Sequence, residues 1–190
     1  MKQLNSNTIK ASDASWPLPL TDRLGASAPP AIQVVGPPEL LIESKTAFFC
    51  SVQTPGTIIL RAHDTAKHIR DKGVTAISGF HSSIEKDCLR ILLRGKQPII
   101  ICPARAIETM RIPSECRAAF EEGRILFISP FVEKPKRVTR DSAIRRNEIV
   151  AALADEAYIA HVTAGSETER ILGLLKAWRV PTQVDSSDIT

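Results

Sequence analysis

The chain has 190 residues, of which 43% are hydrophobic and 24% are charged, proportions that are typical of a folded globular protein. No apolar run approaches the ~20 residues that a membrane-spanning helix needs, so no membrane segment is expected. A formal net charge of +4 mildly favours an acidic partner such as a nucleotide or a nucleic acid.

Residues 1–30 are rich in Ser, Pro, Ala and Asn and have no sustained hydrophobic period. We expect a disordered or loosely docked leader, whose removal leaves the domain folded. Trp16 is the exception, and either packing on the domain or contact with a partner would explain it. The N-terminus lacks the apolar region of a signal peptide, which favours a cytoplasmic protein.

Residues 31–45 contain a Gly-Pro-Pro triplet that cannot lie inside a helix or a central strand, so we expect a connector.

From residue 46 to residue 190, short apolar runs alternate with helical patterns, which indicates one α/β domain. The predicted strands are 46–52, 74–78, 97–103, 124–129, 156–162 and 180–184. The predicted helices are 56–73, 82–95, 113–123, 141–155 (with Asp141 or Ser142 as its N-cap) and 166–178. The alternation predicts a Rossmann-like, mostly parallel sheet with helices on both faces. Ligands of such sheets bind outside the carboxyl ends of the strands.

The first and fifth strands of this domain are followed by small residues at a helix start. Ser51 and a tight Pro55-Gly56 turn follow the first strand, and Gly165 and Ser166 follow the fifth. Backbone N–H groups in such turns suit a phosphate. A plain strand-to-helix turn and a simple helix cap are the alternatives, since short glycine motifs are weak signals.

The stretch SGFHSSIE follows the second strand of the domain and raises the same question. Ser78, Gly79, Ser82 and Ser83 offer donors and close backbone access at the positive end of a helix dipole. Ser82 and Glu85 also have the spacing of a capping box, so helix capping alone is the alternative.

The most basic segment of the chain follows the fourth strand. Its cations are Lys134, Lys136, Arg137, Arg140, Arg145 and Arg146. For 134–140 a solvated surface is the alternative to nucleic-acid binding. Arg146 differs, because its spacing from Ile149, Val150 and Leu153 places it on the inward side of the helix. Arg146 and the neighbouring Asn147 are therefore expected to face either a crevice or a structural acid such as Glu85 or Asp87.

We recognise no catalytic motif in this sequence. We find no Ser-His-Asp spacing, no HExxH, no phosphate-binding GxxxxGK[ST] and no regular GxGxxG, so we expect no catalysis and no cofactor. The four cysteines have no CxxC spacing, which predicts buried reduced thiols rather than a metal site.

Two stretches resemble the Rossmann-like core of the DNA-processing protein A family (DprA, also called Smf). ISGFHSSIEKDCL contains the strand that ends in Ser-Gly, and RRNEIVAALADEAYIAHV matches the family's RNRIIAGLS helix and the strand after it. The resemblance covers roughly 46–184, and Gly165-Ser166 fall where the family has a small-residue turn. Two positions depart from it: the arginine of the first strand's GSR-like turn is missing, and Glu148 replaces the second arginine of RNR.

The resemblance implies binding of single-stranded DNA and loading of a recombinase, here by a short, stand-alone relative. The first hypothesis is therefore a DNA-processing protein that holds single-stranded DNA in a crevice at the strand ends, contacting it through Lys136, Arg137 and Arg140 as well. The second is a small-ligand module that binds a nucleotide or a nucleotide-derived signal, as a sensor or an enzyme. The sequence leaves the oligomeric state open, with a homodimer as one alternative.

Overall fold

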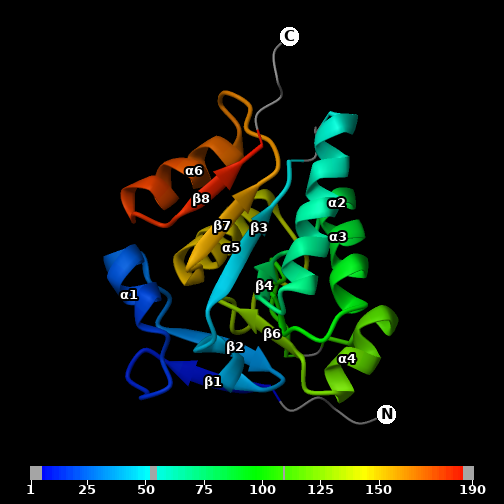
Figure 1. Ribbon diagram of the computed structural model, residues 1–190. Coiled ribbons are helices and arrows are strands. Elements are labelled where there is room, and N and C mark those ends of the chain that lie inside the picture. The colour runs from blue at the N-terminus through cyan, green and yellow to red at the C-terminus, as the bar shows by residue number, and fades with distance from the viewer. Residues whose placement is uncertain (1–5, 52–54, 109, 186–190) are drawn as a thin grey trace.

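The computed structural model describes residues 6–51, 55–108 and 110–185, in which eight strands form a single sheet (Figure 1). The strands are β1 (Asn7–Lys10), β2 (Ala31–Val35), β3 (Lys45–Phe49), β4 (Thr75–Ser78), β5 (Ile99–Ile101), β6 (Ile125–Ser129), β7 (Glu156–Ile159) and β8 (Thr182–Val184). The helices are α1 (Leu18–Leu24), α2 (Gly56–Asp71), α3 (Ser83–Leu93), α4 (Arg117–Glu121), α5 (Arg140–Leu153) and α6 (Glu167–Ala177). Short 3₁₀ turns are η1 (Gly25–Ser27), η2 (Pro38–Leu41) and η3 (Ser114–Cys116).

The strand order is β1-β2-β6-β5-β4-β3-β7-β8, and the strands from β6 to β8 are parallel. The chain moves outward from β3 through β4 and β5 to β6, and then crosses to β7 on the other side of β3. The order of the strands therefore reverses between β3 and β7. In open α/β sheets a ligand crevice forms at this kind of switch point.

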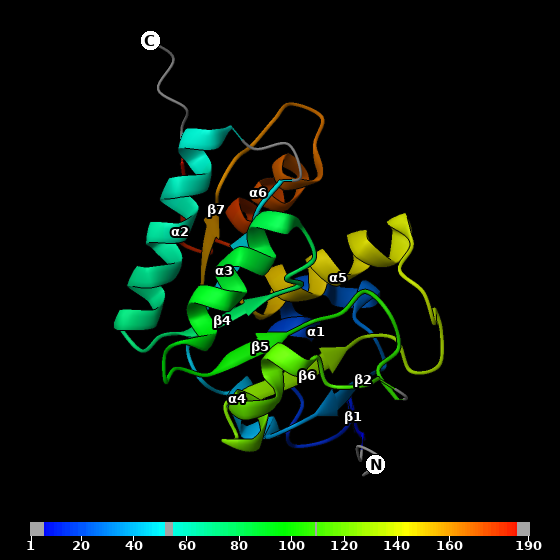
Figure 2. The same ribbon diagram turned by 90° about the vertical axis from the view of Figure 1, so that its right-hand side faces the viewer.

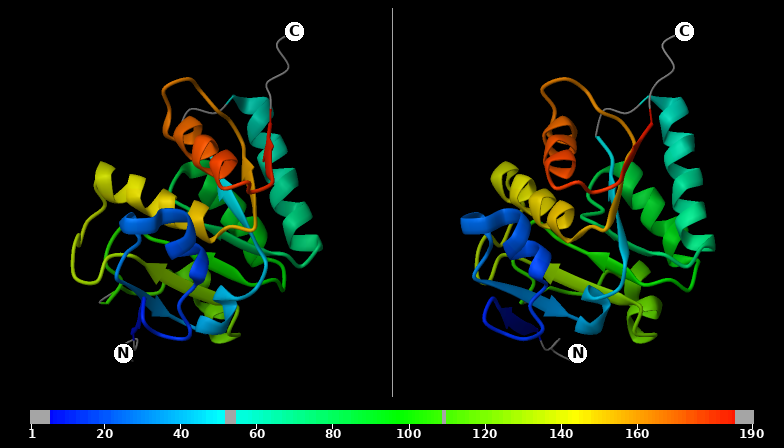
Figure 3. Two further views of the ribbon diagram at one scale, coloured as in Figure 1. Left: turned by 90° about the vertical axis from the view of Figure 1, so that its left-hand side faces the viewer. Right: turned by 60° about the vertical axis from the view of Figure 1, so that its left-hand side comes forward.

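Helices cover both faces of the sheet, as the sequence predicted (Figures 2 and 3). One core holds buried residues of α1, α5 and α6, and the other holds buried residues of α2, α3 and α4. The central strands are consequently apolar on both faces, and all five residues of β6 are buried. Within the described residues, no helix combines the length and the apolar content needed to cross a membrane.

The predicted helix from Asp141 begins one residue earlier, and its cap differs from the prediction. Thr139 is the N-cap, and its hydroxyl accepts a hydrogen bond from the Ser142 backbone N–H at 3.1 Å. The Ser142 hydroxyl in turn accepts from the Thr139 backbone N–H at 2.9 Å, which completes a capping box. The helix therefore starts at Arg140, at the end of the basic loop.

The structure corrects the expectation of a loose leader over residues 1–30. Residues 7–10 form β1, which pairs with β2 in antiparallel register, from Asn7 opposite Val34 to Lys10 opposite Ala31. Trp16 is 5% exposed and Leu20 is fully buried, and both belong to the core that includes α5. One buried residue in each short element produces no hydrophobic period, which is why the sequence pattern does not predict this part of the fold.

The connector predicted over residues 31–45 is also corrected. Residues 31–35 form β2, which pairs with β6 so that Gln33 lies opposite Ser129. The Gly-Pro-Pro triplet ends this strand rather than marking a linker, and Gly36 has a φ of 114°. A Cβ on Gly36 would lie 2.4 Å from the Ile125 carbonyl oxygen, so β2 and the start of β6 approach closely there. The sheet thus extends beyond the 46–190 domain that the sequence predicted.

Candidate functional site

A pocket of about 550 Å³ lies at the switch point, outside the carboxyl ends of β3 and β7. Its walls come from the turns after β3, β4 and β7 and from the first half of α5. The lining residues are Phe49, Cys50, Ser51, His81, Ser82, Glu85, Ala143, Arg146, Asn147, Thr163, Ala164, Gly165, Ser166, Glu167, Thr168 and Ile171.

A second hollow of about 450 Å³ adjoins the pocket along α5. It shares Ala143, Asn147 and three residues of the turn after β7 with the pocket, and it adds Arg140, Ile144 and Arg170. The two hollows are therefore neighbouring parts of one groove, which we call the α5 groove. It leads from the switch point toward the basic loop that precedes α5.

Arg146 lies where the sequence predicted, on the inward side of α5 and in the wall of the pocket. Only 5% of its surface is exposed, and its Nη1 donates a long hydrogen bond of 3.4 Å to the Cys102 carbonyl oxygen. Its Nε has no hydrogen-bond partner. Among the described residues, no carboxylate forms an ion pair with Arg146. The pairing with Glu85 or Asp87 that the sequence left open is thus absent there, and Asp87 pairs with Arg90 instead.

Gly79 is the reason that Arg146 fits in this position. A Cβ placed on Gly79 would lie 1.3 Å from Nη1 and 2.1 Å from Cζ of Arg146, so the guanidinium occupies the space that any other side chain would need. The prediction that the turn after β4 and the start of α5 converge is confirmed for this pair of residues. The missing side chain makes room for the arginine, whereas the sequence suggested that it admits a ligand directly.

Glu85 fills the turn after β4, for which the sequence left a phosphate site and plain helix capping as alternatives. Its carboxylate accepts hydrogen bonds from the backbone N–H groups of Cys50 at 3.1 Å, His81 at 2.8 Å and Ser82 at 3.2 Å. The capping box is confirmed, because the Ser82 hydroxyl accepts from the Glu85 N–H at 3.2 Å. The N–H of Ser82 is therefore committed within the protein, which corrects its expected role as an anion donor. The sequence pointed to Glu85 as part of a capping box or as an acid facing Arg146, and neither suggestion predicts the bond to Cys50.

The turn after β7 is closed in a similar way. The N–H of Gly165 donates to Glu169 Oε2 at 2.7 Å, and the Ser166 hydroxyl accepts from the Glu169 N–H at 3.2 Å. Gly165 and Ser166 line the pocket, yet the contacts of both fit the helix-cap alternative. Asn147 faces this turn, and its Nδ2 donates to Glu167 Oε1 at 3.4 Å.

The remaining predicted site residues divide between the groove and other surfaces. Ser51 lines the pocket, and Arg140 lines the second hollow. Ser78 is 1% exposed, and its hydroxyl accepts from the Phe80 N–H at 3.3 Å. The exposed residues outside the groove lining are Pro55, Gly56, Ser83, Lys136 and Arg137.

The turn at Pro55 and Gly56 fits the alternative of a plain helix start. The carbonyl oxygen of Pro55 accepts from the N–H groups of Ile58 and Ile59, and Gly56 is the first residue of α2. Residues 52–54, which connect Ser51 to this turn, lie outside the described part of the chain.

Some of the cations that line the groove form ion pairs and others do not. Arg170 forms ion pairs with Glu148 at 2.9 Å and Glu167 at 2.8 Å, and Glu148 also pairs with Arg145 at 3.0 Å. The hydrogen bond to Glu167 is the main reason that the pKa of Arg170 is raised. Glu148 thus forms ion pairs with two neighbouring cations. Within the described residues, Arg140 and Arg146 are the groove-lining cations that have no ion-pair partner.

The cysteines are buried free thiols, as the sequence predicted. Burial raises the pKa of Cys88 and Cys102 to about 12, and that of Cys116 to about 11. Cys50 lines the pocket, and its pKa is raised first by burial and then by the charge of Glu85, so it is not a nucleophilic thiolate. No group of three His, Cys, Asp or Glu side chains in the described residues is placed to hold a metal ion.

The parallel sheet, the helices on both faces and the reversal of strand order define a Rossmann-like α/β protein with a groove at the switch point. Residues 7–168 match the model of the DNA recombination-mediator protein A family, so the chain belongs to that family. No curated protein sequence matches the chain.

Solved structures show the same fold. DNA processing protein A from Helicobacter pylori, described for its single-stranded DNA binding mode, aligns with a TM-score of 0.75 and 18% identity, covering 100% of this chain and 85% of that one. The Streptococcus pneumoniae protein aligns with a TM-score of 0.78 and 15% identity, covering 99% of this chain and 65% of that one. A molybdenum cofactor binding protein from Rippkaea orientalis aligns with a TM-score of 0.54 and 12% identity over 76% of this chain and 78% of its own. At these identities the alignments establish the fold alone.

Proposed function

We propose that this protein is a DNA-processing protein that binds single-stranded DNA through the α5 groove, without catalysis. Membership of the DNA recombination-mediator protein A family supports the DNA partner, and the similar Helicobacter pylori protein is described as binding single-stranded DNA. In this role the bound strand is presented to a recombinase, in keeping with the family's description. A homodimer is compatible with this role.

The observation that carries the proposal is the unsatisfied guanidinium of Arg146. A buried cation without a carboxylate partner is unfavourable, because its lost hydration is not replaced. Its Nε lacks a partner, and within the described residues the one acceptor of its N–H groups is the Cys102 carbonyl oxygen at 3.4 Å. A phosphate in the pocket would supply the missing charge and accept two N–H groups of the planar fork.

Few backbone N–H groups in the neighbouring turns remain available to bind an anion. Glu85 and Glu169 already occupy backbone N–H groups of the turns after β4 and β7, so Arg146 is left as the principal anion donor of the pocket. Arg140 lies further along the same groove. The basic loop before it, with Lys136 and Arg137, extends this run of positive charge outside the groove. Several cations that follow one another along the groove and the adjoining loop suit a chain of phosphates better than one isolated anion.

The second candidate, binding of a free nucleotide, is favoured by the volume of the pocket, since about 550 Å³ lies in the range of small-molecule sites. Two measurements separate the candidates. The first is a salt titration of binding to a single-stranded oligonucleotide, and the second is a thermal-shift screen with nucleoside mono-, di- and triphosphates.

We expect the affinity for the oligonucleotide to fall steeply with salt, since counterions are released at each phosphate contact. We expect no single nucleotide to raise the melting temperature at millimolar concentration. Stabilisation by one nucleotide, together with weak and salt-insensitive binding of the oligonucleotide, would support the small-ligand module instead.

A further inference from the structure

The positive charge of this protein is concentrated on two loops at one edge of the sheet. The loop after β5 (103–113) and the loop from β6 to the start of α5 (130–140) together hold six basic and two acidic residues. The basic residues are Arg105, Arg111, Lys134, Lys136, Arg137 and Arg140. The rest of the chain holds 19 basic and 19 acidic residues, so the whole net charge of +4 lies on these two loops.

The two loops are fastened to each other and to the sheet by hydrogen bonds. The Ala106 N–H donates to the Pro135 carbonyl oxygen at 2.9 Å, and the Ser129 hydroxyl donates to the Arg105 carbonyl oxygen at 2.8 Å. The Ile107 N–H donates to Gln33 Oε1 at 3.3 Å. Arg105 is therefore held beside the loop that carries Lys134 and Lys136.

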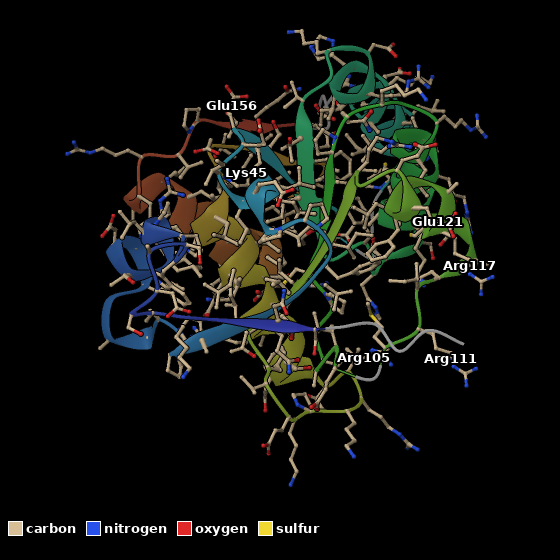
Figure 4. All side chains as sticks on the ribbon, turned by 90° about the horizontal axis from the view of Figure 1, so that it is seen from below. Lys45, Arg105, Arg111, Arg117, Glu121 and Glu156 are labelled. Atoms are coloured by element: carbon tan, nitrogen blue, oxygen red, sulfur yellow. The ribbon has the colours of Figure 1, made fainter. Side chains whose placement is uncertain are left out.

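The cations on these loops are exposed, and within the described residues none of them forms an ion pair. Some arginines elsewhere form ion pairs, such as Arg90 with Asp87 at 2.6 Å and Arg124 with Glu122 at 2.7 Å. Others, such as the exposed Arg94, form none within the described residues, so what distinguishes the two loops is that their cations lie close together in the chain with few acidic residues among them. Seen from below, Arg105 and Arg111 lie on the same side of the molecule, away from Lys45 (Figure 4). A group of unpaired like charges costs free energy by mutual repulsion, which a bound polyanion relieves.

We propose that Arg105 and Arg111 form a second contact region for the backbone of a single DNA strand, outside the α5 groove. This inference rests on the proposed function, and it extends the strand's path from Arg140 across the 130–140 loop to the loop after β5. The contacts are to phosphates, because the described residues of these loops offer exposed cations, whereas their one aromatic side chain, Phe131, is half-buried. Binding in this region is therefore independent of base sequence.

The test compares an Arg105→Ala/Arg111→Ala variant of the full chain with the wild type on oligothymidylates of increasing length, from about 4 to about 20 nucleotides. We expect equal affinities for the shortest strands, which fill the groove alone, and weaker binding by the variant beyond a threshold length. Two lost phosphate contacts should lower the salt slope on the long strand by about 1.4. If the affinities converge at 1 M salt, the long strand binds about 25-fold more weakly at 0.1 M.

The matched control is Lys72→Ala/Arg94→Ala, which removes two exposed cations at the C-caps of α2 and α3. This variant has the same net charge as the test variant, and we expect its length dependence to equal that of the wild type. An equal loss in both variants would overturn the inference, because net charge would then explain the effect. Equal binding by the test variant and the wild type at every length would also overturn it.

The failure of the proposed function has a different signature. In that case the wild type itself shows no salt-dependent binding at any length, and Arg146→Ala changes nothing. Normal wild-type binding that depends on Arg146, with no contribution from Arg105 and Arg111, would overturn only the second contact region.

Discussion

Arg146 and Gly79 form a unit in which neither residue is explained without the other. A glycine at the end of β4 weakens the strand end by its flexibility, and a buried arginine without an acid is costly. Here the glycine leaves the space that the guanidinium fills, and the guanidinium lines a pocket. An anion bound in this pocket would offset the free-energy cost of burying the unpaired charge. Two locally unfavourable choices at one place are typical of a functional site.

The first prediction is that Gly79→Ala mimics the loss of Arg146. The new Cβ collides with the end of a flexible side chain, so the fold should survive while the guanidinium is displaced. We expect Gly79→Ala and Arg146→Ala each to weaken oligonucleotide binding by roughly 1.5–3 kcal/mol, the size of a charge-assisted hydrogen bond. The double variant should lose no more than either single variant, because both changes remove the same contact. Fluorescence anisotropy measures the affinities.

Gly173→Ala is the matched control for this cycle. Gly173 lies in α6, and an added Cβ there meets nothing within 4 Å, so binding should be unchanged and the helix slightly more stable. Melting temperatures are measured on the same preparations. A loss of stability with intact affinity in Arg146→Ala would show that the arginine is structural.

The sequence predicted the helices and strands that show a hydrophobic pattern within their own segment. It missed the elements whose position depends on packing against another element. The strands buried on both faces appear as continuous apolar runs, and α2 shows its buried face at Ile58, Ala62, Ala66 and Ile69. By contrast, β1 buries one residue of four and α1 one of seven. Neither has a period of its own, and each is defined by the element on which it packs.

In the candidate site too, the position of whole elements could be predicted, whereas contacts between distant residues could not. The convergence of the turn after β4 with α5 was predictable, because parallel strands end at one edge of the sheet. The closure of that turn by Glu85 was not predictable, because it requires a hydrogen bond to Cys50, which is 35 residues away in the chain. A long side chain that can reach several N–H groups leaves no local pattern beyond its capping box.

The second prediction concerns the contact between α1 and the end of α5. Arg23 Nη1 donates to the carbonyl oxygens of Ala152 at 2.9 Å and Ala154 at 2.6 Å, where the helix dipole places negative charge. We expect Arg23→Ala to lower the free energy of unfolding by about 1–2 kcal/mol in urea denaturation. Oligonucleotide affinity should be unchanged, because Arg23 is not among the residues that line the groove.

Asp22→Ala provides the comparison for Arg23→Ala, because Asp22 is the exposed neighbour on α1. Equal stability of the two variants would show that the contacts of Arg23 contribute little. Weaker oligonucleotide binding by Arg23→Ala would instead show that the end of α5 is coupled to the groove.

For the whole molecule, the topology places the two features of interest at the same edge of the sheet. The reversal of strand order between β3 and β7 opens the pocket, and the loops after β5 and β6 leave from the carboxyl ends of neighbouring parallel strands. The net charge of +4 therefore lies on loops at the same edge of the sheet as the pocket, the side from which we propose that a DNA strand enters the groove. A polyanion approaching a molecule with this asymmetry is oriented before contact, which raises its association rate at low salt.

The last prediction concerns the N-terminal segment, which the sequence suggested was dispensable. Trp16 is 5% exposed, packs in the core that includes α5, and donates its indole N–H to the Thr21 hydroxyl at 2.8 Å. We expect Trp16→Ala to cost roughly 3–5 kcal/mol, as for a buried aromatic, and to lower the melting temperature by about 10 °C. Leu18→Ala, two residues away and 67% exposed, should change the melting temperature by little.

Deletion of residues 1–30 should lower the stability more than either substitution, because it also removes β1, which pairs with the outer edge of β2, and so exposes that edge of the sheet. A truncated chain that melts like the wild type would restore the view of this segment as a loose leader.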